Sequence, residues 1–86
     1  MTDEMLASSI VRILYRVHPA PLRRETLASE CEVALSRVLS REEFDRELGA
    51  LVQRGLVRTG RIGILGNAES LFLSQTGFAE AARVFG

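Results

Sequence analysis

The chain has 86 residues, of which 47% are hydrophobic and 26% charged, with only two prolines. Domains most often contain about 100–150 residues, so two halves of this chain would each lack a core. The apolar content is too high for a disordered chain, and the interspersed charges exclude a membrane-spanning one. We therefore expect one soluble domain over residues 1–86.

The charges balance, with eleven basic residues, all of them arginine, and eleven acidic ones, and the isoelectric point is about 6.6. No overall positive field attracts nucleic acid, so contact with phosphate must depend on local groups of arginine. The single cysteine, Cys31, cannot form an internal disulfide, and the acidic start Asp3-Glu4 differs from a secretory signal. These features indicate a cytoplasmic protein that lies in no membrane.

Two amphipathic helices are expected in the first part of the chain. Apolar residues recur every three or four positions over residues 3–17, and the segment His18-Pro19-Ala20-Pro21 ends this first helix. A second helix is predicted over about Arg23–Glu32, with Cys31 on its inner side. Residues 33–39 are compatible either with an extension of that helix or with an apolar connector.

The sharpest local pattern is Ser40-Arg41-Glu42-Glu43, which has the sequence of a capping box. In this motif the serine hydroxyl accepts a hydrogen bond from the amide of residue 43, and the glutamate carboxylate accepts one from the serine amide. Gly55 supplies the left-handed residue that ends many helices, so a third helix is predicted between residues 40 and 55. Its inner face is expected to contain Phe44, Leu48, Leu51 and Val52.

Two strands and a last helix are expected after the third helix. Residues 56–59 and 71–73 have the composition of strands, and Gly66-Asn67 between them is suited to a two-residue turn. Ser74 or Thr76 can cap the last helix. Its apolar stripe is expected to contain Phe78, Ala81, Ala82 and Phe85.

The order of three helices, a hairpin and a final helix resembles the winged helix-turn-helix domains of prokaryotic regulators. The motif Leu48-x-x-Leu51-Val52-x-x-Gly55-Leu56-Val57 is similar to a recognition helix turning into the wing. Leu73-Ser74-x-x-Gly77 is similar to the junction of strand and last helix in that family. The resemblance covers about residues 5 to 85. It implies a mainly α fold with a small β-hairpin: three helices, a two- or three-stranded wing and a C-terminal helix.

In that family the third helix lies in the major groove of duplex DNA. The resemblance therefore implies a dimeric transcription regulator in which Arg46 meets a base edge or a phosphate. Arginines at the start of the second helix and near the wing would hold the DNA backbone. The DNA-binding residues implied in this way are Arg23, Arg24, Arg41, Arg46, Gln53, Arg58 and Arg61.

Other features favour a protein-interaction or assembly module that keeps the fold without binding DNA. Residues 40–55 contain three arginines and four acidic residues, a net charge of −1 where DNA presents dense negative charge. The expected wing is apolar, which suits contact with protein. Two residues of the first helix lie off its core stripe and are candidates for a homodimer seam. The interface residues predicted from these features are Val11, Tyr15, Ile62, Ile64 and Leu65.

Catalysis, metal binding and a cofactor are not expected. The residues offer no metal-ligand cluster, no nucleophile beside a histidine and no cleft with paired carboxylates. His18, the only histidine, lies at the end of a helix, and Cys31 lies on an apolar stripe. The spacing Gly60-x-x-Gly63-x-x-Gly66 lacks both the pattern and the lysine of a phosphate-binding loop.

Overall fold

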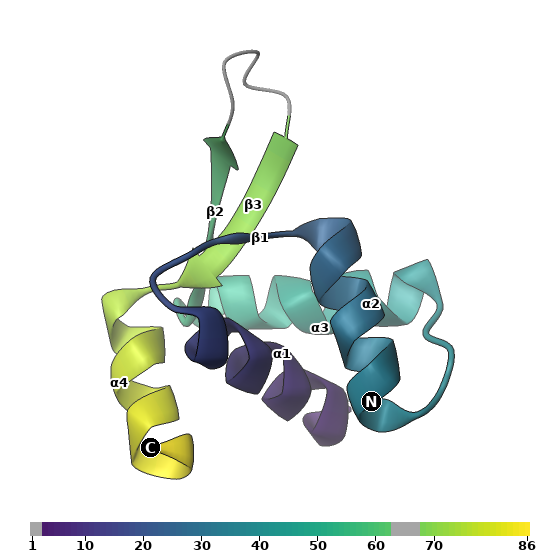
Figure 1. Ribbon diagram of the computed structural model, residues 1–86, viewed down its shortest axis with the longest axis horizontal. Coiled ribbons are helices and arrows are strands. Elements are labelled where there is room, and N and C mark those ends of the chain that lie inside the picture. Colours follow the sequence, from purple (N-terminus) through teal and green to yellow (C-terminus); the bar gives the residue numbers. More distant parts are fainter. Residues whose placement is uncertain (1–2, 63–67) are drawn as a thin grey trace.

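The computed structural model describes residues 3–62 and 68–86, and within them four helices pack together while a hairpin projects from one side (Figure 1). This arrangement confirms the predicted mainly α fold with a small hairpin. The elements in chain order are α1 (Glu4–Val17), β1 (Leu22–Arg23), α2 (Arg24–Leu35), α3 (Arg41–Gln53), β2 (Val57–Ile62), β3 (Ala68–Leu73) and α4 (Gln75–Phe85).

The end of α2 decides whether residues 33–39 extend that helix or form a connector. α2 continues to Leu35, so only residues 36–40 form the connector to α3. The connector is fixed by Ser36, which adopts a left-handed conformation with φ of 54°, and by Glu32. The carboxylate of Glu32 accepts a hydrogen bond from the Leu39 amide at 2.8 Å. The Glu32 side chain of α2 thus holds the connector at the point where the chain turns into α3.

Both ends of α3 are closed as the sequence predicts. The Glu43 amide donates to the Ser40 hydroxyl at 3.0 Å, and the Ser40 amide donates to the Glu43 carboxylate at 3.3 Å, which completes the capping box. At the other end Gly55 has a φ of 77°, and the Leu56 amide donates to the Leu51 carbonyl at 3.0 Å. This is the geometry of a Schellman C-cap.

The inner face of α3 differs from the prediction at one position. Val52, which we predicted to face inward, is 37% exposed, whereas Glu47 is 3% exposed. The buried stripe runs through positions 44, 47, 48 and 51, and Val52 lies about 100° around the helix from Leu51. Glu47 is tolerated inside because its carboxylate accepts a hydrogen bond from the Asp3 amide at 2.9 Å. The placement of Val52 in the core was therefore wrong.

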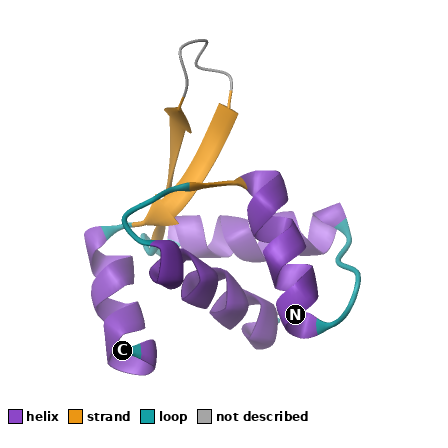
Figure 2. Cartoon of the chain, viewed as in Figure 1, coloured by secondary structure: helices purple, strands orange, loops and turns teal. Residues whose placement is uncertain are grey.

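The sheet has the strand order β1-β3-β2, and both pairings are antiparallel (Figure 2). The register places Val57 opposite Leu73 and Thr59 opposite Leu71, which in turn lies opposite Leu22 of β1. β1 was not predicted, because two residues are too few to show strand periodicity. The predicted turn at Gly66-Asn67 lies outside the described residues.

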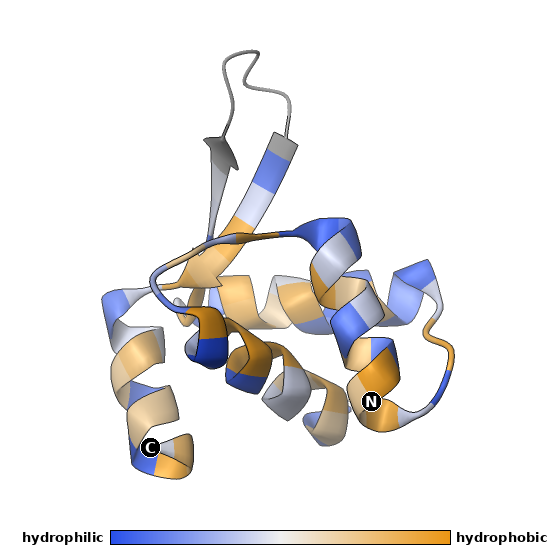
Figure 3. Cartoon of the chain, viewed as in Figure 1, coloured by the Kyte–Doolittle hydropathy of each residue, from blue (hydrophilic) through white to orange (hydrophobic). Residues whose placement is uncertain are grey.

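The end of β3 nearest the helices is hydrophobic, and the strand becomes hydrophilic toward the far end of the hairpin (Figure 3). Its apolar end joins a single core to which all four helices contribute. No helix in the described part of the chain is both long and apolar enough to cross a membrane. The buried core residues are Leu6, Ile10, Ile13, Leu14, Leu27, Cys31, Phe44, Leu48, Leu51, Val57, Leu71, Leu73 and Ala81.

The start of α4 lies against the end of α3 with no space between the backbones. Ser74 caps α4 by accepting from the Gly77 amide at 2.9 Å, and its own amide donates to the Leu56 carbonyl at 3.0 Å. A Cβ atom at Gly77 would overlap the Leu56 carbonyl oxygen and lie 2.8 Å from the carbonyl carbon. Within the predicted stripe of α4, Ala81 is buried but Phe78 is exposed at the surface, where its ring stacks on His18 with centroids 4.2 Å apart.

Candidate nucleic-acid interface

The side of α3 opposite the core is open to solvent. Arg46 and Gln53 are both exposed on it and are seven residues, or about two helical turns, apart. Between them Ala50 is exposed, and a Cβ atom at Gly49 would meet nothing within 4 Å. We call the surface formed by Glu42, Arg46, Gly49, Ala50 and Gln53 the free side of α3. No described element of the chain covers it.

A second side of α3 faces the hairpin across a hollow. Arg41, Asp45, Gly49 and Val52 line it from α3, Thr59 and Glu69 from the two strands, and Arg24 from the start of α2. The exposed position of Val52 is explained by this hollow, because the side chain turns toward the hairpin rather than into the core.

An ion-pair network of Arg24, Arg41, Asp45 and Glu69 spans this hollow. Arg24 Nη1 lies 2.6 Å from Asp45 Oδ1, and Arg24 Nη2 lies 2.8 Å from Glu69 Oε1. One guanidinium thus connects the start of α2 to α3 and to β3. Arg41 Nε lies 3.8 Å from the second oxygen of Asp45, and the Arg41 side chain is 90% exposed.

Opposing effects act on the pKa of Arg24. Partial burial lowers the pKa, but hydrogen bonds and charge from Glu69, and then from Asp45, outweigh burial and raise it above the ordinary arginine value. The Arg24 side chain is 32% exposed, so water screens these pairs. Arg24 is therefore a charged group whose donors are directed at carboxylates of its own chain.

The remaining predicted arginines lie on the sheet. Arg23 and Arg58 are exposed, and each follows a residue of its strand, Leu22 or Val57, that packs on or against the core. Since successive strand residues point to opposite faces, both arginines belong to the face of the sheet turned away from the helices. The backbone of Arg61 pairs with Glu69 across the hairpin, and its side chain lies outside the described residues.

The predicted DNA-binding residues therefore fall into three groups rather than one. The free side of α3 carries Arg46 and Gln53, the hollow holds Arg24 and Arg41, and the outer face of the sheet carries Arg23 and Arg58. Sequence reasoning missed the carboxylates that hold Arg24. Within the network only Arg41 and Asp45, four residues apart on one helix, are neighbours by local spacing, and no sequence signal relates Arg24 to Glu69, 45 positions away.

The predicted interface residues lie on α1 and on the wing. Tyr15 is half-buried against α4 of its own chain, with ring centroids 5.3 Å from Phe78 and 6.4 Å from Phe85. Val11 is half-buried and lines a hollow between α1 and α4. The predictions for Ile64, Leu65 and the side chain of Ile62 lie outside the described residues.

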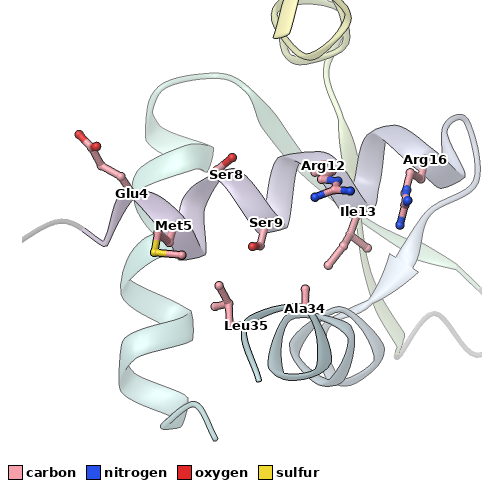
Figure 4. A pocket seen from close by; sticks show the side chains of 9 residues that line it. All are labelled: Glu4, Met5, Ser8, Ser9, Arg12, Ile13, Arg16, Ala34 and Leu35. Atoms are coloured by element: carbon pink, nitrogen blue, oxygen red, sulfur yellow. The ribbon is translucent and has the colours of Figure 1, made fainter. Parts of the chain in front are cut away.

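Another hollow lies between α1 and the end of α2, with Ile13 and Leu35 directed into it and Arg12 and Arg16 along α1 (Figure 4). No described residue of α3 or of the hairpin lines this hollow, so it is separate from the candidate interface. Among residues 3–62 and 68–86, no group of three or more histidine, cysteine, aspartate or glutamate side chains is arranged to hold a metal ion.

No protein-family model matches the chain, and no curated protein matches it. Solved structures do. A mutant of MepR from a multidrug-resistant clinical isolate of S. aureus superposes with a TM-score of 0.70 and 13% identity over 99% of this chain, which spans 56% of MepR. A winged-helix DNA-binding protein from STIV superposes with a TM-score of 0.66 and 17% identity, over 88% of this chain and 79% of the STIV protein.

A protein from Ralstonia eutropha, to which DNA binding is ascribed, gives a TM-score of 0.68 and 20% identity over the full length of both chains. At these identities the similarity establishes the fold. The chain has a winged helix-turn-helix fold, in which α2 and α3 form the helix-turn-helix and β2 and β3 the wing.

Proposed function

We propose that the protein binds duplex DNA as a transcription regulator, with the free side of α3 in the major groove and the wing beside it. The observation that supports this most strongly is the uncovered side of a capped, rigid helix next to a projecting hairpin (Figure 1). The major groove of B-DNA admits an α-helix of this kind. Two of the structural neighbours are themselves described as DNA-binding.

Each exposed group on this surface has a distinct expected role. Arg46 can donate two hydrogen bonds to guanine, and Gln53 can pair with adenine, which are the usual contacts of these side chains in the major groove. Gly49 and Ala50 between them let the groove wall approach the helix. Arg23, Arg41 and Arg58 are expected to contact phosphates and so to position the protein rather than to read sequence.

The test is a salt titration of binding to random duplex DNA. Phosphate contacts predict that the logarithm of affinity falls with the logarithm of salt concentration by about 0.9 per neutralised phosphate. Arg58→Ala should weaken binding to all sequences alike and reduce this slope by about one phosphate contact. Arg12→Ala removes the same charge from α1 and is the matched control, which should leave the slope unchanged. A wild-type protein that shows no binding at low salt would refute the proposal.

We also propose that two copies associate through the hollow between α1 and α4. Val84, 70% exposed, and Val11 provide apolar surface there. Arg54 lines the same hollow together with Glu4 and Glu80, so opposite charges can meet when two copies are related by a two-fold axis. Sedimentation equilibrium should give twice the chain mass, and Val84→Asp should give the single mass, whereas Val33→Asp on α2, where Val33 is 78% exposed, should not. A wild-type monomer at all concentrations would contradict this.

A protein-interaction module is the second candidate function. It is favoured by Asp45 and Glu69, which place negative charge between α3 and the wing where DNA phosphates would come close. The same titration separates the two functions, because a module of this kind predicts association between copies without any binding to DNA at low salt.

A further inference from the structure

The carboxylates in the hollow between α3 and the wing do more than neutralise charge, because both are directed at one arginine. Asp45 and Glu69 each accept from a different nitrogen of the Arg24 guanidinium, at 2.6 and 2.8 Å. A guanidinium engages a phosphate with the same pair of parallel donors. Asp45 and Glu69 thus engage both terminal nitrogens of Arg24, the pair that would otherwise bind two oxygens of one phosphate end-on.

We propose that Asp45 and Glu69 are specificity-determining residues that withhold Arg24 from DNA phosphate and so lower the affinity for non-specific DNA. This inference rests on the proposed function. In the state described here, a random duplex meets the free side of α3 without help from Arg24. A duplex that complements α3 is bound closely enough for its backbone to compete with the carboxylates, and only then does Arg24 join the interface.

The geometry allows this exchange without unfolding any element. The Arg24 side chain is 32% exposed and its two partners are 42% and 45% exposed, so the network is open to an incoming ligand. Exposed ion pairs of this kind contribute little to the stability of a fold, so a phosphate can displace them at small cost. Arg41, which contacts Asp45 only at 3.8 Å, is available to hold that carboxylate after Arg24 leaves.

The test compares the salt dependence of random duplex binding in four proteins. Asp45→Asn combined with Glu69→Gln removes both competing charges while keeping the shape of the side chains. With Arg24 released to one phosphate, the slope should steepen by about 0.9, which corresponds to roughly a three- to four-fold larger change in affinity between about 50 and 200 mM salt. Adding Arg24→Ala to this double variant should abolish the gain.

The control for a general charge effect is Glu30→Gln. Glu30 is exposed on α2, belongs to none of the surfaces proposed to contact DNA, and forms no ion pair within the described part of the chain, so its neutralisation should not produce the Arg24-dependent gain. Thermal unfolding of each variant checks that the fold is retained.

The outcomes separate the two proposals. If the wild type binds and the double variant has the same slope, the role of Asp45 and Glu69 is refuted while the proposed function stands. A gain that persists without Arg24, or that Glu30→Gln reproduces, also refutes it, because the effect then comes from net charge. If neither the wild type nor the double variant binds at low salt, the proposed function fails and the inference with it.

Discussion

Gly77 and Gly49 allow the same substitution to be made in two helices with opposite expected results. Gly77 lies in the first turn of α4, where a Cβ atom would overlap the Leu56 carbonyl oxygen and lie 3.2 Å from the Leu56 Cα atom. The neighbour is backbone, so it cannot move aside as the end of a side chain would. Gly77→Ala therefore requires α4 to shift away from the end of α3.

The magnitude follows from what such a shift disrupts. Overpacking costs typically about 1–3 kcal/mol. The hydrogen bonds that Ser74 donates to the Leu56 and Gly55 carbonyls, at 3.0 and 2.6 Å, would be strained or lost, at about 0.5–1.5 kcal/mol each. The better helix propensity of alanine offsets about 1 kcal/mol. These terms span about 1–5 kcal/mol, so we expect Gly77→Ala to lower the free energy of unfolding by about 3 kcal/mol, and Tm by roughly 12–24 °C in a domain of this size.

The matched control is Gly49→Ala, in the middle of α3, where a Cβ atom would meet nothing within 4 Å. There alanine should raise the free energy of unfolding by about 0.5–1 kcal/mol, since only helix propensity changes. Urea unfolding followed by circular dichroism measures both variants. Equal effects of the two substitutions, or a Gly77→Ala protein as stable as the wild type, would show that α4 does not contact Leu56 as described.

Three further predictions concern the helix cap and the titrating groups. Ser40→Ala removes the hydroxyl that caps α3 and should lower the free energy of unfolding by about 0.5–2 kcal/mol in urea unfolding; no change would place the start of α3 elsewhere. The Glu43 pKa is lowered because its carboxylate accepts from the Ser40 amide and pairs with Arg37. This stabilisation is fully present above the Glu43 pKa of the unfolded chain and is lost as the pH falls through the lower Glu43 pKa of the folded protein. In a plot of Tm against pH, Glu43→Gln should therefore show a smaller fall in Tm at acidic pH. Burial raises the pKa of Cys31 to about 11 from 9.0, so the thiol of the unfolded chain ionises at a lower pH than that of the folded protein. The free energy of unfolding should therefore fall as the pH rises between these two values, and the fall should be smaller in Cys31→Ala.

Patterns completed within a few residues were predictable from the sequence. The capping box of Ser40 and Glu43 requires only four positions, and the left-handed Gly55 only the turn that precedes it. Both were found because their hydrogen bonds are local, and local geometry is nearly independent of the rest of the fold. The same applies to Ser74, where two capping residues were open and the structure selects the first.

Contacts between distant segments were not predictable in this way. Arg24 meets Asp45 and Glu69 because α2, α3 and β3 converge, at separations of 21 and 45 residues. Val52 was misplaced because an apolar residue at the edge of a helical stripe can face either a core or a neighbouring hairpin. The burial of Glu47 depends on the Asp3 amide 44 residues earlier, which periodicity cannot reveal.

The two backbone hydrogen bonds of Leu56, one to α3 and one to α4, also have a consequence for the spacing of DNA half-sites. The Leu56 carbonyl holds the start of α4, while its amide closes the end of α3, so the helix proposed to read DNA and the helix of the proposed dimer contact meet at one residue. In a two-fold dimer the distance between the two reading helices would then be fixed by a rigid link instead of an adjustable one. Such a dimer should tolerate base changes in the spacer between its half-sites but reject the insertion of even a few base pairs there.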